Sequence, residues 1–249
     1  MSADFASHPD QSRHTAIPAR CTTIASRRLI LAITGASGMI YAQKLLAHLL
    51  EEKTSGTSET YEASEVSEAW EASEKSGTSG TSGTSGIEVH LIISRQAIEV
   101  LKAELGLGPE YFQQLPVVYH DCRDFSSPLA TGSFHTQGMI ILPCSMNSLA
   151  AIAHGLSLNL IHRAAAVCLK ERRKLILVPR ESPLSSIHLK NMLTLSRDGA
   201  IILPASPAFY NHPKDLEDLV EFFVQRILDQ IGQASSCFEA YARERNTEP

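Results

Sequence analysis

Long apolar runs, clustered cysteines and excess positive charge are all missing from this 249-residue chain. No segment approaches the ~20 consecutive apolar residues of a membrane-spanning helix, so no membrane association is expected. The five cysteines form no CxxC pair and no Cys/His pair with metal-ligand spacing, which favours a reducing compartment and predicts no metal site. A net charge of -5 lacks the basic excess of nucleic-acid-binding proteins, so no nucleic-acid partner is expected. What remains is an ordinary globular composition, 43% hydrophobic and 20% charged.

Two kinds of polar segment interrupt or flank the apolar pattern. Residues 1–28 lack the apolar stretch of a secretory signal and are predicted to be a flexible tail, and residues 233–249 are predicted to form a C-terminal tail. Residues 51–86 are rich in Glu, Ser and Thr and end in a Ser-Gly-Thr repeat, which predicts a low-complexity insertion within a single domain spanning 29–232. The expected location is the cytoplasm, and the four arginines of the first 28 residues leave a mitochondrial transit peptide as the alternative.

Strands and helices alternate along the rest of the chain. Strands are predicted at 29–33, 89–93, 139–142, 175–178 and 200–203, and helices at 40–50, 95–105, 149–154, 160–171, 186–198 and 215–231. The strands are apolar without alternation, which is typical of a parallel sheet buried on both faces. The pattern predicts an α/β fold with one Rossmann-like or flavodoxin-like doubly wound parallel sheet. Ligands of such sheets bind at the carboxyl ends of the strands.

The most informative segment is 143–150, Pro-Cys-Ser-Met-Asn-Ser-Leu-Ala, between the strand at 139–142 and an apolar helical pattern. A helix start offers N–H groups and a positive dipole end to an anion. Ser145, Asn147 and Ser148 add side-chain donors and acceptors at the same place. An ordinary helix N-cap is the alternative, because Ser and Asn serve that purpose in many proteins without a ligand.

A second candidate cradle is the turn Gly35-Ala36-Ser37-Gly38 after the first strand. It has only GxxG rather than GxGxxG, and the second strand ends in Ser94 rather than in the acidic residue that binds the ribose of NAD. Ser37, Ser94 and Ser145 follow three strands that we expect to be adjacent. Their convergence suits a mononucleotide phosphate such as that of FMN, although a tight strand-to-helix turn remains an alternative for 35–38.

Six motifs in chain order together resemble the UbiX/Pad family of flavin prenyltransferases, over about 29–232 apart from the insertion. They are Gly35-Ala36-Ser37-Gly38, Ile93-Ser94, Cys144-Ser145-Met146-Asn147-Ser148-Leu149-Ala150, Arg163 with Leu169-Lys170-Glu171-Arg172, Val178-Pro179-Arg180-Glu181-Ser182-Pro183, and Pro207-Ala208-Phe209-Tyr210. The segment with Asp124-Phe125 and residues 130–133 also resembles the family's substrate-side loop.

The resemblance implies transfer of a dimethylallyl group from dimethylallyl phosphate to reduced FMN. The product, prenylated FMN, serves UbiD-type decarboxylases of ubiquinone biosynthesis or aromatic-acid decarboxylation. The resemblance also implies a homododecamer with active sites at subunit interfaces and no metal. The donor could also be the diphosphate.

Roles for individual residues follow from the same resemblance. FMN is expected to bind Gly35, Ala36, Ser37, Ser94, Ser145, Met146, Asn147, Ser148 and Arg180. The substrate phosphate is expected to bind Lys170, Tyr210 and Arg226, whose charges and hydroxyl suit a departing phosphate. Glu104 and Glu181, with Lys170, are the expected catalytic residues, the two carboxyl groups handling protons at the flavin and the leaving phosphate. Each of these side chains also has an ordinary structural interpretation, such as a solvated helix face.

Two other functions remain open from the sequence. A flavin-dependent cysteine decarboxylase shares Pro143, Ser145 and Asn147, but such enzymes usually carry a Pro-Ala-Met-Asn type motif where this chain has Pro179-Arg180-Glu181. A flavin-binding carrier without catalysis is the second alternative, and the complete set Lys170, Glu181, Tyr210 and Arg226 argues against it.

Overall fold

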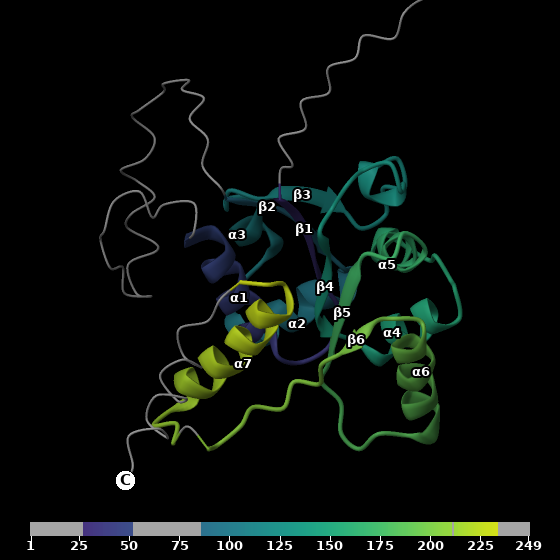
Figure 1. The fold of residues 1–249 in the computed structure, drawn as a ribbon. Coiled ribbons are helices and arrows are strands. Elements are labelled where there is room, and N and C mark those ends of the chain that lie inside the picture. The colour runs from purple at the N-terminus through teal and green to yellow at the C-terminus, as the bar shows by residue number, and fades with distance from the viewer. Residues whose placement is uncertain (1–26, 52–85, 211, 234–249) are drawn as a thin grey trace, which may run out of the picture.

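A computed structural model describes residues 27–51, 86–210 and 212–233 of the chain. Its centre is one six-stranded sheet in the order β3-β2-β1-β4-β5-β6, and every pairing in it is parallel (Figure 1). The order reverses between β1 and β4, so the switch point of the sheet lies between these two strands. The predicted doubly wound α/β fold is therefore confirmed, with the strand order of dinucleotide-binding sheets.

The central strands are buried on both faces, as their continuous apolar sequence predicts. The strands are β1 (Arg27–Ile33), β2 (Ile87–Ile93), β3 (Val118–Asp121), β4 (Gly138–Cys144), β5 (Lys174–Pro179) and β6 (Ile201–Ile202). Successive residues of β1 point into different cores: Leu29, Leu31 and Ile33 join one cluster, whereas Ile30 and Ala32 join the other. This division follows from the two-residue period of a strand.

Helices cover the two faces of the sheet. They are α1 (Met39–Glu51), α2 (Arg95–Leu105), α3 (Pro109–Gln113), the 3-10 helix η2 (Pro128–Ala130), α4 (Met146–Ala153), α5 (Leu160–Lys170), α6 (Ser186–Arg197) and α7 (Leu216–Gln230). The core on one face includes residues of α1, α2, α3 and α7, and the core on the other includes residues of η2, α4, α5 and α6 (Figure 1). This division places α5 and α7 on opposite faces.

The structure differs from the predicted elements in four places. The chain has a further strand, β3, and a short helix, α3, between α2 and β4, so the strand at 139–142 is the fourth rather than the third. Edge strand β3 is short and partly exposed, so it lacks the apolar signal of the central strands. Helix α4 begins at Met146 instead of 149, and the strand predicted at 200–203 is reduced to Ile201–Ile202.

Ion pairs join α7 to α1. Lys44 Nζ lies 2.5 Å from a Glu217 carboxylate oxygen and 3.5 Å from one of Glu221, and His48 Nε2 lies 2.9 Å from the Glu221 carboxylate. Hydrogen bonds from His48 and Gln225 and the charges of His48 and Lys44 outweigh the partial burial of Glu221. They lower the pKa of this carboxyl group to about 2. The pairs help to hold α7, which carries Arg226, against the domain.

Most of the tails and insertion predicted from the sequence, namely 1–26, 52–85 and 234–249, lie outside the described residues. Their predicted character therefore stays a prediction.

Candidate active site

Thr34 joins the carboxyl ends of β1 and β4 at the switch point. It is 1% exposed, and its hydroxyl donates to the carbonyl of Pro143 at 2.8 Å while accepting from the backbone N–H of Ser145 at 2.7 Å. On the other side, the N–H of Ser94 donates to the carbonyl of Ile33 at 2.9 Å. The ends of β2, β1 and β4 are thus tied together, and the prediction that these three strands are adjacent is confirmed.

Ser145 is the N-cap of α4. Its hydroxyl oxygen accepts from the N–H of Ser148 at 3.3 Å and its hydroxyl lies 3.1 Å from that of Ser148. Ser145 therefore acts as a helix N-cap. Ser148 is buried, Ser145 and Met146 are partly exposed, and Asn147 is exposed beside the helix start. The positive end of α4 thus opens at the switch point with an amide side chain beside it, which suits an anionic ligand.

The turn at 35–38 packs tightly against the start of α2. A Cβ on Gly35 would lie 2.6 Å from the Cβ of Gln96, so no larger residue fits there without moving one of the two elements. Ser94 is the N-cap of α2, accepts from the N–H of Ala97 at 3.2 Å, and is 5% exposed. Both residues therefore have a structural purpose at the place predicted to bind FMN.

Glu104, from α2, occupies the start of α1. Its carboxylate accepts from the N–H of Met39 at 2.8 Å and from that of Gly38 at 3.0 Å. Burial raises the pKa of Glu104, but hydrogen bonds from Ser37, Met39 and Gly38 and the charge of Arg180 outweigh it, so the net pKa is lowered. Glu104 is accordingly ionised at neutral pH, in the state of a proton acceptor.

Arg180 reaches across the switch point from the end of β5. Its Nε donates to the carbonyl of Ser37 at 3.2 Å, so the side chain spans from β5 past β4 to the turn after β1. Ser37, Glu104 and Arg180, which are far apart in the sequence, thus meet at one edge of the sheet. The adjacent Glu181 is exposed, and its carboxylate accepts from the N–H of Ser182 at 3.1 Å.

The three predicted phosphate ligands do not join this group. Lys170 ends α5, four residues before β5 begins, and so lies near the amino edge of the sheet. Tyr210 packs edge-on against Phe222 of α7 at 5.4 Å between ring centroids, and Arg226 follows Phe222 by one turn. Since α5 and α7 cover opposite faces, one chain does not bring Lys170 together with Arg226.

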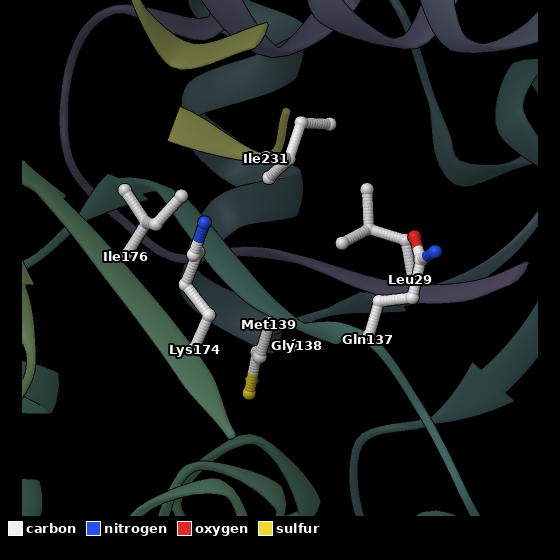
Figure 2. Close-up of a pocket in the computed structure, with 7 residues that line it drawn as sticks. All are labelled: Leu29, Gln137, Gly138, Met139, Lys174, Ile176 and Ile231. Carbon is white, nitrogen blue, oxygen red and sulfur yellow. The ribbon is translucent and has the colours of Figure 1, made fainter. Parts of the chain in front are cut away.

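Two hollows of the single chain lie away from the switch point. Lys170 borders a groove of about 380 Å³ at the carboxyl ends of α4, α5 and α6, with Gly155, Arg172 and Asp198. A cavity of about 40 Å³ lies under Ile231 and Leu29 at the amino edge of the sheet, beside Lys174 (Figure 2). The smaller one has room for no more than a few water molecules.

The described part of the chain contains neither a group of side chains suited to a metal ion nor a membrane-spanning helix. Within it, no three His, Cys, Asp or Glu side chains group closely enough to hold a metal ion. Over residues 27–51, 86–210 and 212–233, no helix combines the length and apolar character needed to cross a bilayer.

Sequence reasoning overlooked Thr34 as an organiser of the site. The available signal was a hydroxyl residue that directly follows a wholly apolar strand, because a buried hydroxyl requires hydrogen-bond partners. The partners themselves, at 143 and 145, are more than a hundred positions away.

Comparisons with known proteins agree on one group of relatives. A model of the flavoprotein family matches residues 81–228. The chain is 41% identical over 214 residues to the flavin prenyltransferase UbiX of Methanocaldococcus jannaschii, covering 86% of this chain and 98% of the relative. It is also 41% identical over 212 residues to the mitochondrial flavin prenyltransferase PAD1 of Saccharomyces cerevisiae, covering 85% and 74% respectively.

Two solved structures with clear sequence similarity share the fold. The structure of AnUbiX (PadA1) in complex with FMN and dimethylallyl pyrophosphate has a TM-score of 0.68 at 37% identity, covering 83% of this chain and 92% of that one. A dodecameric FMN-dependent UbiX-like decarboxylase from Escherichia coli O157:H7 has a TM-score of 0.66 at 37% identity, covering 84% and 96%. The similarity thus extends over nearly the whole length of both solved chains.

Proposed function

Since the chain belongs to the UbiX family of flavin prenyltransferases, we propose that it transfers a dimethylallyl group from dimethylallyl phosphate to reduced FMN. The observation that carries this proposal is the 41% identity that extends over 98% of the Methanocaldococcus relative. The resemblance that the six motifs indicated is therefore confirmed at the level of the family.

FMN is proposed to bind at the switch point, where open α/β sheets bind their ligands. The residues there fit such a group: the start of α4 offers N–H groups and a positive dipole end, and Arg180 adds a cation. Met146 and Asn147 border the same place, and the turn at 35–38 forms its other wall. Reduced FMN supplies the electron-rich ring to which the dimethylallyl carbon becomes bonded.

Lys170, Tyr210 and Arg226 are proposed to hold the substrate phosphate at an interface between protomers. Their separation within one chain supports this, because a phosphate needs its ligands within a few ångströms. All three lie on the surface of the single chain, which a neighbouring copy can contact. We infer a homododecamer, which the dodecameric UbiX-like relative from Escherichia coli supports.

Glu104 and Glu181 are proposed to transfer protons during the reaction, one as acceptor and the other as donor. During transfer, the bond between the dimethylallyl carbon and the phosphate oxygen breaks, the carbon bonds to the flavin, and the flavin gives up a proton. Glu104, being ionised, is the proposed acceptor of that proton. Glu181 is the proposed donor to the leaving oxygen. It is exposed in the single chain, so the assembly or the ligands would have to shield it from water during the transfer.

The product and its destination belong to the same proposal. Prenylated FMN is expected to pass to a UbiD-type decarboxylase, in ubiquinone biosynthesis or aromatic-acid decarboxylation. The proposed location is the cytoplasm, with the mitochondrion as the alternative that the name of the yeast relative suggests. Fractionation of cells that express the full chain distinguishes the two.

The proposed function is tested by mixing the purified protein anaerobically with reduced FMN and dimethylallyl phosphate and measuring the flavin mass. The expected result is a gain of one five-carbon unit that is lost in Glu181→Gln or Arg226→Met, and a parallel reaction with the diphosphate identifies the donor. Bound but unmodified FMN with either donor, beside an active relative as positive control, would overturn the proposal in favour of the cysteine decarboxylase or the carrier.

A further inference from the structure

The segment 127–134, here called the anchored segment, connects β3 to β4 and includes η2, which lies beside α5 (Figure 1). Arginines from the α5 region hold its backbone. Arg163 Nε donates to the carbonyl of Ala130 at 2.9 Å, and Arg173 donates to the carbonyls of Phe134, at 2.7 Å, and of Gly132. One guanidinium thus binds two carbonyls two residues apart, which a point charge cannot reproduce.

Both ends of the anchored segment are also fastened to the sheet. The hydroxyl of Ser127 lies 2.9 Å from His120 Nδ1, and His120 Nε2 lies 2.9 Å from Nδ1 of the buried His90. The ring of Phe134 packs edge-on against His90, at 5.2 Å between centroids, and under Arg28, whose Cζ is 4.6 Å from the ring centroid. Between these fastenings, Thr131 and Ser133 hydrogen-bond each other across Gly132, and Arg173 is the side chain that holds the Gly132 carbonyl.

Gly132 lies directly against the ion pair of Lys170 and Glu171. A Cβ on Gly132 would lie 2.9 Å from Lys170 Nζ and 2.7 Å from the carboxyl carbon of Glu171. The two charged ends therefore occupy space that a side chain at position 132 would take. If the anchored segment moves, the space in which the Lys170 ammonium group can lie changes as well.

We propose that Arg173 is a positioning residue which, by holding the carbonyl of Gly132, sets the place of the Lys170 ammonium for the substrate phosphate. This inference rests on the proposed function, because Lys170 is a phosphate ligand only there. Arg173 itself is turned to the two carbonyls and is not assigned a contact with the substrate. Misplacement of a binding group by about 1 Å can cost up to ~100-fold in rate.

Two variants test the inference by independent routes. Arg173→Lys keeps the charge and loses the paired contact. Gly132→Ala keeps Arg173 and forces Lys170 and Glu171 to move, and the fold should tolerate it because the crowded atoms are the far ends of flexible side chains. The matched control is Arg172→Gln, which removes a neighbouring exposed charge.

The measurements are anaerobic steady-state kinetics with reduced FMN and dimethylallyl phosphate, together with FMN titrations. Both variants are expected to raise the KM for dimethylallyl phosphate about tenfold while the Kd of FMN stays within twofold, and Arg172→Gln is expected to match the wild type. A merely structural defect would instead reduce the active fraction and leave KM unchanged.

Lys170→Met separates the failure of this inference from that of the proposed function. An inactive wild type overturns both, and a normal KM in Lys170→Met overturns the phosphate role of Lys170 and the inference with it. With Lys170 shown to matter, a wild-type KM in Gly132→Ala and Arg173→Lys, or an equal rise in Arg172→Gln, overturns the inference alone. If Arg173→Lys does not fold, the result for Gly132→Ala decides.

Discussion

Replacing Thr34 with valine removes one hydroxyl from the point where β1 and β4 diverge. The shape of the side chain is nearly kept, so the substitution tests hydrogen bonding rather than packing. Two contacts are lost: the bond accepted from the N–H of Ser145 at 2.7 Å and the bond donated to the carbonyl of Pro143 at 2.8 Å. The Pro143 carbonyl still accepts from the N–H of residue 34, at 3.2 Å, whereas the Ser145 N–H loses the partner that places it.

The expected loss of stability comes mainly from the Ser145 N–H, because the Pro143 carbonyl keeps a hydrogen-bond partner and this N–H does not. A partly buried N–H without a partner lowers the free energy of unfolding by ~1–3 kcal/mol, because the group loses its hydrogen bonds to water and gains none in the protein. For a domain of this size, about 2 kcal/mol corresponds to a fall of roughly 4–8 °C in Tm. Thr34→Ser keeps the hydroxyl and loses only a methyl group, so it should lose clearly less than Thr34→Val.

The assay combines thermal and urea denaturation with a titration of FMN. Because Ser145 caps α4 beside the proposed flavin site, Thr34→Val should also weaken FMN binding several-fold, and Thr34→Ser should bind FMN nearly as the wild type does. An unchanged Tm and FMN affinity in Thr34→Val would refute the view that this hydroxyl organises the switch point.

Three further predictions concern titratable groups. Glu104→Gln should destabilise the protein at pH 7, measured by urea midpoints. Because the pKa of Glu104 is lowered on folding, the difference in stability between wild type and variant should shrink as pH falls below about 4.3. A stability difference that persists at low pH would contradict a charged cap on α1. Glu221→Gln should lower the free energy of unfolding by on the order of 2–3 kcal/mol at neutral pH, and this loss should disappear between about pH 4.3 and 2. An equal loss at neutral and at acidic pH would show that the α1–α7 ion pairs do not stabilise the fold. Burial lowers the pKa of His90 and His120, so the stability of the protein should fall as pH drops below about 6.5. In this range the melting temperature of His120→Gln should depend less on pH than that of the wild type. Parallel pH profiles of the two melting temperatures would show that this histidine pair does not cause the fall.

Secondary structure could be predicted from the sequence where the residues of one continuous segment determine it. The apolar runs predicted the central strands, and the helix predicted at 95–105 coincides with α2 (Arg95–Leu105) because its sequence pattern is local. The start of α4 was misplaced by three residues because the apolar helical pattern begins only at Leu149, whereas hydrogen bonding shows that Ser145 is the cap. Strand β3 was missed because an exposed edge strand does not need an apolar sequence.

The sequence by itself determined the fold class and the family and supplied the side chains of the candidate site, because buried periodicity and ordered motifs are local properties. The tertiary structure alone decided their arrangement. It brought Arg180 onto the carbonyl of Ser37, turned Glu104 into an ionised cap of α1, and set Lys170 and Arg226 on opposite faces of the sheet. These relations depend on strand order and helix placement, which arise from contacts between residues far apart in the chain.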